Sequence, residues 1–158
     1  MKKLDLTYLC GTIGSLCGFP VRLYEGNELV FKVDHSGLKY DPIQASQADL
    51  FALSDHIGTY ITPRYYYYGV VRSGKTRLIM GPTRQLPATE QQLRELAFMS
   101  NVPAEDTSEF IQAMRSLIPM PLESLQQILC TLNYVMNGEK LSLEDIALSE
   151  PAEKQISS

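Results

Sequence analysis

Apolar and polar residues alternate in several short runs across the first half of the chain. Such alternation is typical of strands that bury one face. The runs are residues 21–24, 28–33, 59–62, 65–72 and 76–80. Glu25-Gly26-Asn27 separates the first two runs and Ser73-Gly74-Lys75 separates the last two. Because short Gly-containing segments favour hairpin turns, the pattern predicts an antiparallel sheet of about five strands.

Apolar residues at intervals of three and four predict helices at the start of the chain and through its last third. The predicted helices are residues 4–17, 89–99, 105–117 and 122–137, and residues 42–56 are expected to contain one or two helical turns. Thr89 is a suitable N-cap for the second helix, and Asn137-Gly138 is a suitable end for the last one. The fold class expected from these elements is α+β, a central antiparallel sheet with flanking helices.

Glycine, proline and acidic residues predict three local features: a helix that packs closely, the end or edge of a strand, and a C-terminal linker. Gly11 and Gly14 weaken the first helix and would allow a neighbouring helix to approach closely. Pro82 has no N–H for a sheet ladder, so it should end its strand or lie on a sheet edge. After Gly138 the residues become small and acidic, which favours a fraying linker. We therefore expect one folded domain at residues 1–138 and a linker at residues 139–158.

Length and charge limit the classes of function. The chain has 158 residues, the size of one ordinary domain. Its net charge of −4 makes it a poor binder of DNA or of an anionic membrane, because both are bound through Lys and Arg. No apolar run approaches the roughly 18 residues of a membrane span, and no signal-peptide cleavage site follows the apolar start. The three cysteines lack CxxC spacing, which fits reduced, buried thiols in a cytoplasmic protein.

No stretch of the chain matches a known catalytic or metal-binding motif. His35 and His56 are the only histidines, and neither has metal-ligand spacing to other residues. We interpret both as turn residues rather than as bases paired with the preceding aspartates. Residues 73–76 imitate the end of a phosphate-binding P-loop, but they lie between two strands, where a hairpin turn is the better interpretation. We therefore expect no enzyme activity, no cofactor and no metal.

The run of four tyrosines at residues 65–68 is the least ordinary feature of the sequence. Alternation along a strand places Tyr65 and Tyr67 on one face and Tyr66 and Tyr68 on the other. One pair can cover the core, and the other pair must meet solvent, a second subunit or a ligand. Tyrosine combines a flat apolar ring with a hydroxyl, which suits a small polar ligand. Packing within a core or an interface explains the run equally well.

The order of these segments resembles the N-terminal sensor region of AraC-type transcriptional regulators. The resemblance covers nearly the whole chain and includes a Leu-Tyr-Glu hairpin, a tyrosine-rich strand pair and the helix that starts Glu90-Gln91-Gln92-Leu93. Its most specific parts are Gly81-Pro82-x-Arg84 and Leu132-Asn133-Tyr134-x-x-Asn137-Gly138. Neither part is a chemical signature.

The resemblance implies a PAS/GAF-like sensor that binds a small-molecule effector, such as a sugar or a small acid, and forms a homodimer. It also implies a helix-turn-helix domain that follows this region. Nothing after Gly138 has the length or basic charge to form such a domain, so the resemblance implies that DNA is bound only by the missing C-terminal domain. The expected ligand contacts are Tyr66, Tyr68, Tyr60, Phe31 and Arg84. Arg84 could pair with a carboxylate or phosphate, or be an ordinary surface charge. The alternative is a purely structural dimerisation module without an effector, in which the sheet or the 122–136 helix forms the contact.

Overall fold

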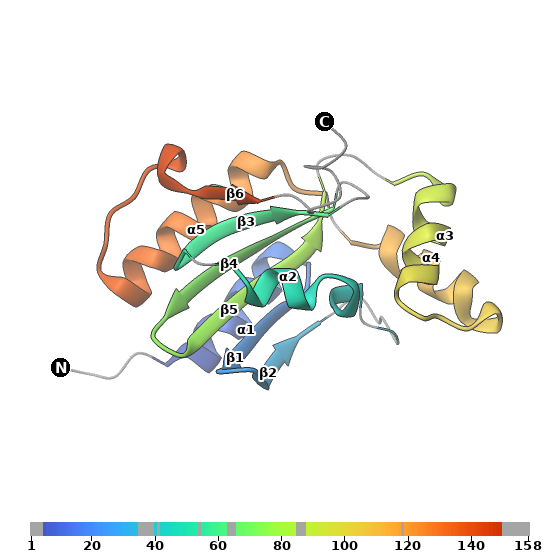
Figure 1. Cartoon of the computed structure of the whole chain (residues 1–158), viewed down its shortest axis with the longest axis horizontal. Coiled ribbons are helices and arrows are strands. Elements are labelled where there is room, and N and C mark those ends of the chain that lie inside the picture. Colours follow the sequence, from blue (N-terminus) through green and yellow to red (C-terminus); the bar gives the residue numbers. More distant parts are fainter. Residues whose placement is uncertain are drawn as a thin grey trace.

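A six-stranded sheet with helices on both faces forms the body of the protein (Figure 1). The structure is a computed structural model, and it describes residues 5–34, 40, 42–53, 55–62, 66–84, 88–117 and 119–149. Its strands follow the order β2-β1-β5-β4-β3-β6. Their bounds are β1 Val21–Glu25, β2 Glu28–Val33, β3 Ile57–Ile61, β4 Tyr67–Ser73, β5 Thr76–Thr83 and β6 Ala147–Ser149. The first five strands pair antiparallel, as the sequence predicts, and the α+β class is confirmed.

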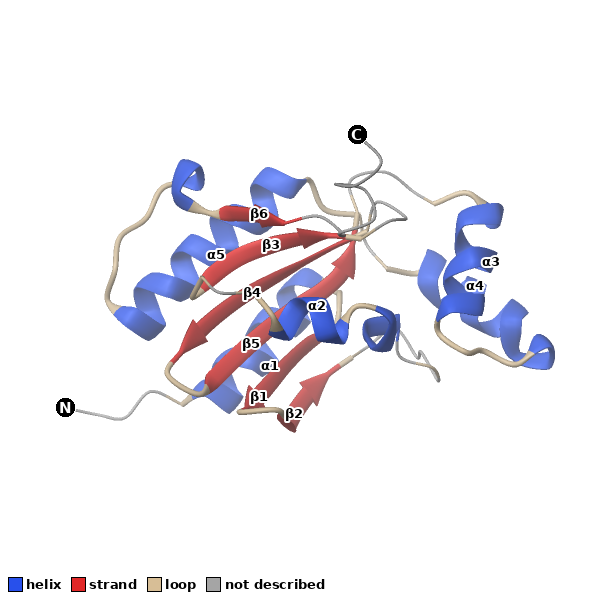
Figure 2. Cartoon of the chain, viewed as in Figure 1, coloured by secondary structure: helices blue, strands red, loops and turns tan. Residues whose placement is uncertain are grey.

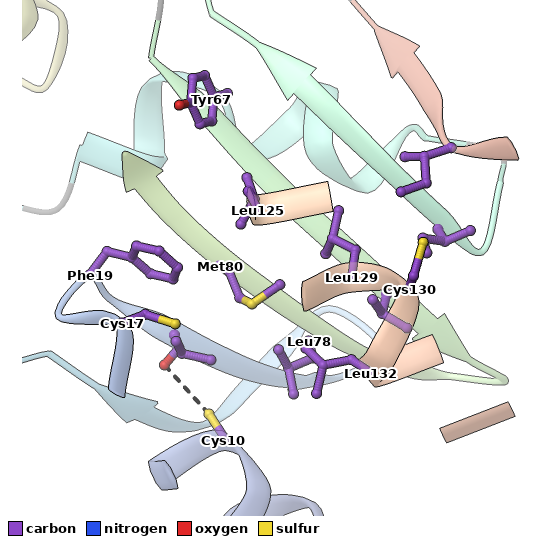
Figure 3. Close-up of a cluster of buried hydrophobic side chains, with 14 of the residues drawn as sticks. Cys10, Cys17, Phe19, Tyr67, Leu78, Met80, Leu125, Leu129, Cys130 and Leu132 are labelled. Atoms are coloured by element: carbon purple, nitrogen blue, oxygen red, sulfur yellow. Dashed lines mark hydrogen bonds between the residues drawn. The ribbon is translucent and has the colours of Figure 1, made fainter. Parts of the chain in front are cut away.

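Helices α1 and α5 cover one face of this sheet (Figure 2). α1 spans Leu6–Cys17 and packs on β1 and β2, while α5 spans Leu122–Asn137 and packs on β3 and β4. Leu125, Leu129 and Leu132 of α5 are almost fully buried against the strands (Figure 3). Gly69 of β4 makes room for this packing, because a Cβ at that position would lie 2.8 Å from Leu129 Cδ2. The middle of the apolar stripe of the last predicted helix is therefore core, whereas Val135 in the same stripe is 42% exposed.

A short 3-10 helix, Pro42–Ala45, and helix α2, Gln47–Phe51, cover the opposite face. Their buried cluster includes Tyr24, Tyr60, Tyr68 and Leu50. The Tyr60 hydroxyl donates to Asp49 Oδ2 at 2.8 Å, which ties α2 to β3. The helical turns expected within residues 42–56 are thus confirmed, and they shield the second face of the sheet from water.

Helices α3 and α4 form a separate pair at one end of the sheet (Figure 1). α3 spans Glu90–Met99, and α4 spans Thr107–Arg115 after a 3-10 turn at Ala104–Asp106. α3 begins as expected at Thr89, whose hydroxyl accepts from the Gln92 N–H while the Gln92 side chain accepts from the Thr89 N–H. The pair encloses its own apolar cluster, whose members come from the two helices, from Leu117 and from Tyr66. Tyr66 is therefore the residue through which the strand region enters this cluster.

The expectation for Pro82 is not met, because β5 lies between β1 and β4 and continues to Thr83. The β4–β5 register passes from Tyr67 opposite Thr83 to Gly69 opposite Met80. Two residues of β5, Gly81 and Pro82, therefore face the single residue Tyr68, which is the arrangement of a β-bulge. A bulge relieves Pro82 of the need to donate to the ladder, so proline is tolerated inside a central strand.

Two further expectations need correction. Gly14 approaches a strand rather than a helix, since a Cβ there would lie 2.7 Å from Val33 Cγ1 of β2. Residues 143–149 do not behave as a linker: Leu143–Asp145 form a 3-10 turn, Ile146 is buried in the core, and β6 pairs parallel with β3. The sequence pattern missed β6 because a three-residue strand is too short to show alternation.

Candidate functional site

A cavity of about 340 Å³ lies where the sheet meets the α3–α4 pair. Its walls come from both parts of the molecule. The polar side chains that line it are Tyr66, Thr83, Arg84 and Arg115. The apolar ones are Ala88, Leu93, Met114, Leu117 and Pro119. We call this space the Arg84 cavity. Its volume is near the lower end of the roughly 300–1,000 Å³ typical of small-molecule sites.

The ends of two adjacent strands position Tyr66 and Arg84. Tyr66 directly precedes β4, and its backbone is held to Thr62 in both directions: its carbonyl accepts from the Thr62 N–H at 2.7 Å, and its N–H donates to Thr62 Oγ1 at 3.2 Å. Arg84 directly follows β5, and its carbonyl accepts from the Met120 N–H at 2.9 Å. Pairing of Tyr67 with Thr83 across the two strands brings their neighbours together. The sheet therefore fixes one wall of the cavity.

The Arg84 guanidinium is held by two contacts. Its Cζ lies 5.1 Å from the centre of the Tyr66 ring, a cation–π distance, and its Nη1 donates to Gln92 Oε1 of α3 at 3.1 Å. Its Nε is buried and makes no hydrogen bond with any residue that the structure describes. Leaving a buried donor unpaired costs about 1–3 kcal/mol, and more when the group is charged. This Nε is thus an unsatisfied donor on a residue that lines the Arg84 cavity.

Two phenols lie close to this charge. Burial raises the pKa of Tyr66 above its ordinary value, and the neighbouring Arg84 guanidinium opposes part of that rise. Burial also raises the pKa of Tyr67 to about 12, again opposed by Arg84, and the Tyr67 hydroxyl donates to the Met120 carbonyl. Both phenols keep their protons at neutral pH, so Tyr66 adds a neutral polar group to the lining of the cavity.

Raising the pH above about 10 should destabilise the protein through Tyr67. In the unfolded chain this phenol ionises near pH 10, whereas in the folded protein it keeps its proton to about pH 12. Between these values the unfolded state binds fewer protons than the folded state, so the free energy of unfolding falls as the pH rises. Urea unfolding below and above about pH 10 measures this loss, which Tyr67→Phe should reduce. Tyr8→Phe changes a phenol that is 73% exposed and is the control; the same pH slope in wild type and Tyr67→Phe would contradict the assignment.

The structure divides the five residues predicted as ligand contacts among three places. Tyr66 and Arg84 meet at the Arg84 cavity. Tyr60 and Tyr68 are 2% and 1% exposed in the cluster beneath α2. Phe31 packs against the core on the α1 side. Tyr66 and Tyr68 do not share a face as expected, because Tyr66 lies before β4 begins and does not follow the strand alternation; Tyr65 lies outside the described residues.

Sequence reasoning missed the helical wall of the cavity. Leu93, Met114 and Leu117 belong to apolar stripes that the spacing does predict. Nothing in that spacing shows that the stripes of α3 and α4 enclose a residue from the strand region. Arg115 carried no signal at all, because a single exposed arginine at the end of a helix is an ordinary surface residue.

A second hollow, of about 390 Å³, lies between α1 and α5. It is mostly apolar, and we call it the α1–α5 groove. Its lining residues are Leu9, Ile13, Ser124, Gln127, Ile128, Thr131, Leu132 and Val135. Large apolar side chains of the same two helices are exposed, among them Tyr8, Leu16 and Tyr134. An exposed apolar groove is a candidate contact surface for another protein.

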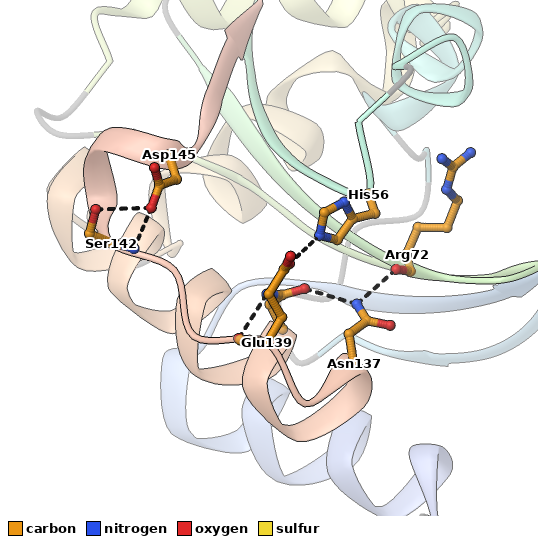
Figure 4. Close-up of polar contacts among 7 residues, drawn as sticks. His56, Arg72, Asn137, Glu139, Ser142 and Asp145 are labelled. Carbon is orange, nitrogen blue, oxygen red and sulfur yellow. Dashed lines mark hydrogen bonds and ion pairs between the residues drawn. The ribbon is translucent and has the colours of Figure 1, made fainter.

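A polar cluster joins the end of α5 to β3 and β4 (Figure 4). His56 Nε2 lies 2.6 Å from Glu139 Oε1, and Asn137 Nδ2 donates to the Arg72 carbonyl at 3.0 Å. The hydrogen bond from His56 holds the pKa of Glu139 below its ordinary value, with further help from Asn133. The side chains of His56 and Glu139 are 43% and 45% exposed and line neither cavity described above, so this pair is a surface tie. His35 lies outside the described residues.

Among the residues that the structure describes, no three His, Cys, Asp or Glu side chains gather as a metal site would require. Within the same residues, no helix has the length and apolar character needed to cross a membrane. Cys10, Cys17 and Cys130 are all buried and unbridged, and burial raises the pKa of each thiol. A raised pKa disfavours the nucleophilic thiolate.

No protein-family model, no curated protein and no solved structure matches this chain.

Proposed function

We propose that this chain is a small-molecule-sensing and dimerising regulatory domain of a bacterial transcription regulator of the AraC type. The Arg84 cavity is the observation that carries the proposal. It is enclosed by apolar side chains, it holds a few polar groups that can orient a ligand, and its size suits a metabolite. The PAS/GAF-like fold is part of the same proposal; the five antiparallel strands with helices on both faces support it.

The cavity can convert ligand binding into movement because its walls belong to two parts of the molecule. Thr83 and Arg84 extend from the sheet, whereas Leu93 and Met114 belong to α3 and α4. A ligand that contacts both walls favours the arrangement in which they are correctly spaced, which is a shift of population between states. The free energy by which the ligand shifts the equilibrium between the two arrangements equals the difference between its binding free energies for them.

A direct path leads from the cavity to α5. Met120 stands just before this helix, its N–H bonds to the Arg84 carbonyl, and its carbonyl accepts from the Tyr67 hydroxyl. A displacement of Arg84 would therefore act on the start of α5, and through α5 on the segment that forms β6. In the regulator that the resemblance implies, the attached helix-turn-helix domains would be repositioned along this route.

A thermal-shift screen with sugars, sugar phosphates and small organic acids tests the sensing function. A ligand present at about 100 times its Kd stabilises the folded state by about 2.7 kcal/mol, which raises the Tm by several degrees for a chain of this size. Ala88→Phe, which adds a ring to the cavity wall, should abolish the response. The proposal fails if no compound in a broad library shifts the wild-type Tm, or if every shift persists in Ala88→Phe.

The second candidate is a structural module that dimerises without an effector, and the α1–α5 groove is the observation that favours it. In a symmetric dimer the same surface patch on both subunits would cover this groove. Val135 lines the groove and is 42% exposed, so Val135→Glu should produce a monomer. Phe98→Glu places the same charge on α3, at a side chain that is 84% exposed and not part of the groove, and should leave the dimer intact. Sedimentation that shows a monomer for the wild-type chain at high concentration would remove the dimer.

A further inference from the structure

We infer that the Arg84 cavity binds a small carboxylic acid with an apolar body, and that the ligand carboxylate pairs with the Arg84 guanidinium. This inference rests on the proposed sensing function and specifies the class of effector. Three features of the cavity support the inference: the Arg84 donor that no described residue satisfies, the charge of the lining, and the apolar wall on the α3–α4 side.

Arg84 lines the cavity, and one donor of its guanidinium, the buried Nε, is unpaired among the described residues. Its Nη1 is already bonded to Gln92 Oε1, and its Cζ lies over the ring of Tyr66 at 5.1 Å from the ring centre. The Nε edge of an arginine carries two parallel N–H donors, and the two oxygens of a carboxylate match them. The contacts with Gln92 and Tyr66 hold this donor pair in place before a ligand arrives, which reduces the entropy lost on binding.

The lining of the cavity is positively charged. Arg84 and Arg115 both contribute to it, and no Asp or Glu is among the described residues that line it. The protonated Tyr66 phenol adds a neutral donor beside Arg84. An acidic ligand is thus favoured by this site even though the whole chain carries a net charge of −4.

The helical wall requires an apolar ligand body. Leu93, Met114 and Leu117 face the cavity from the α3–α4 side. A sugar would place several hydroxyls against these side chains without hydrogen-bond partners, which is unfavourable. A phosphate monoester spreads a charge of about −2 over three terminal oxygens, whereas the Arg84 edge matches the two oxygens of a carboxylate. A volume of about 340 Å³ has room for an aliphatic or aromatic acid of metabolite size.

The test compares acids with their neutral isosteres on the intact chain. The probes are benzoate, phenylacetate and hexanoate, the three corresponding amides, phenyl phosphate and glucose, with binding measured by calorimetry and by ligand-observed NMR at neutral pH. We expect at least one acid to bind about tenfold or more tightly than its amide. Arg84→Gln should remove that preference, and Arg84→Lys should keep part of it because the charge remains without the planar fork.

The matched control is Arg94→Gln. It removes the same charge from α3, but Arg94 points to the surface, where its side chain is 55% exposed and pairs with Glu90 at 3.6 Å. Affinity for the acids should not change in this variant. Circular dichroism and the Tm of each variant show whether it is folded, and Arg84→Lys serves as the test if Arg84→Gln does not fold.

The possible results separate the ligand class from the sensing function. If amides or glucose bind as tightly as the acids and Ala88→Phe blocks that binding, the assignment of a carboxylic acid as the ligand is overturned. The proposed sensing function would still stand. Phenyl phosphate that binds more tightly than benzoate would also overturn the carboxylic acid assignment, as would acid binding that is unchanged in Arg84→Gln. The absence of binding by every acid overturns it as well, and if the broad library also gives no binding, the sensing function falls with it.

Discussion

Replacing Tyr66 with alanine should loosen the α3–α4 pair from the sheet. Tyr66 is 4% exposed and is the residue preceding β4 that enters the apolar cluster of these helices. Truncating a buried aromatic side chain costs about 3–5 kcal/mol. Because the lost contacts lie at one junction, amide hydrogen exchange should accelerate mainly in α3 and α4 and much less in β1 and β5.

Two variants serve as controls for Tyr66→Ala. Tyr66→Phe keeps the ring that packs in the cluster and stacks with Arg84, so it should retain most of the stability and the slow exchange of α3 and α4. Tyr8→Ala removes a side chain that is 73% exposed and should change the stability by about 0.5 kcal/mol or less. Uniform acceleration of exchange across the whole sheet in Tyr66→Ala would contradict the assignment of Tyr66 to a local junction.

Gly81→Ala should be at least as damaging, because the backbone at this position leaves no room for a side chain. Gly81 has a φ of +124°, and a Cβ there would lie 2.9 Å from the Tyr67 carbonyl oxygen and 3.0 Å from Tyr68 Cδ1. A strained backbone costs about 1–3 kcal/mol and overpacking costs a similar amount. We therefore expect a loss of about 3 kcal/mol or more, measured by urea unfolding.

Gly26→Ala is the matched control for the steric clash between the added Cβ and β4. Gly26 also has a positive φ, +62°, but a Cβ there would meet nothing within 4 Å. It should therefore show only the backbone cost, about 1–2 kcal/mol. Equal losses of unfolding free energy in Gly81→Ala and Gly26→Ala would show that β4 does not exclude a side chain at Gly81.

The surroundings of Gly81 connect this position to the candidate site. Its carbonyl accepts from Nη1 of Arg22 at 2.8 Å, and Arg22 is fully buried. Arg84 follows three residues later, after the bulge formed by Gly81 and Pro82 opposite Tyr68. A folded Gly81 variant should therefore also displace Arg84 and weaken ligand binding. The Gly-Pro-x-Arg segment has a physical role here: it ends a central strand with an arginine aimed at the helical pair.

Local patterns were sufficient for most of the fold. Alternation located β1 and β2, spacing of three and four located α1 and α5, and the two hairpins followed from Gly26 and Gly74. Each of these signals lies within a few residues of the element that it specifies. β6 and the bulge at Pro82 were missed, because both depend on pairing with residues far away in the sequence.

The candidate site was harder to predict for the same reason. Tyr66 and Arg84 stood out as an aromatic residue and a cation near strand ends, and the structure brings them together. Tyr60 and Tyr68 carry the same chemistry but are covered by α2, and no pattern in the sequence distinguishes them from Tyr66. A cavity between distant elements is a property of tertiary packing, and short-range periodicity does not encode it.

Methyl NMR of the methionines tests the central claim most directly. The chain has six methionines, and Met114 lines the Arg84 cavity, whereas Met80 and Met136 pack at the α1–α5 face of the sheet. Titration with the tightest ligand from the screen should shift the Met114 methyl resonance most, and those of Met80 and Met136 less, because only Met114 of these three lines the cavity. A ligand that shifts Met136 or Met80 but not Met114 would show that the effector site lies elsewhere.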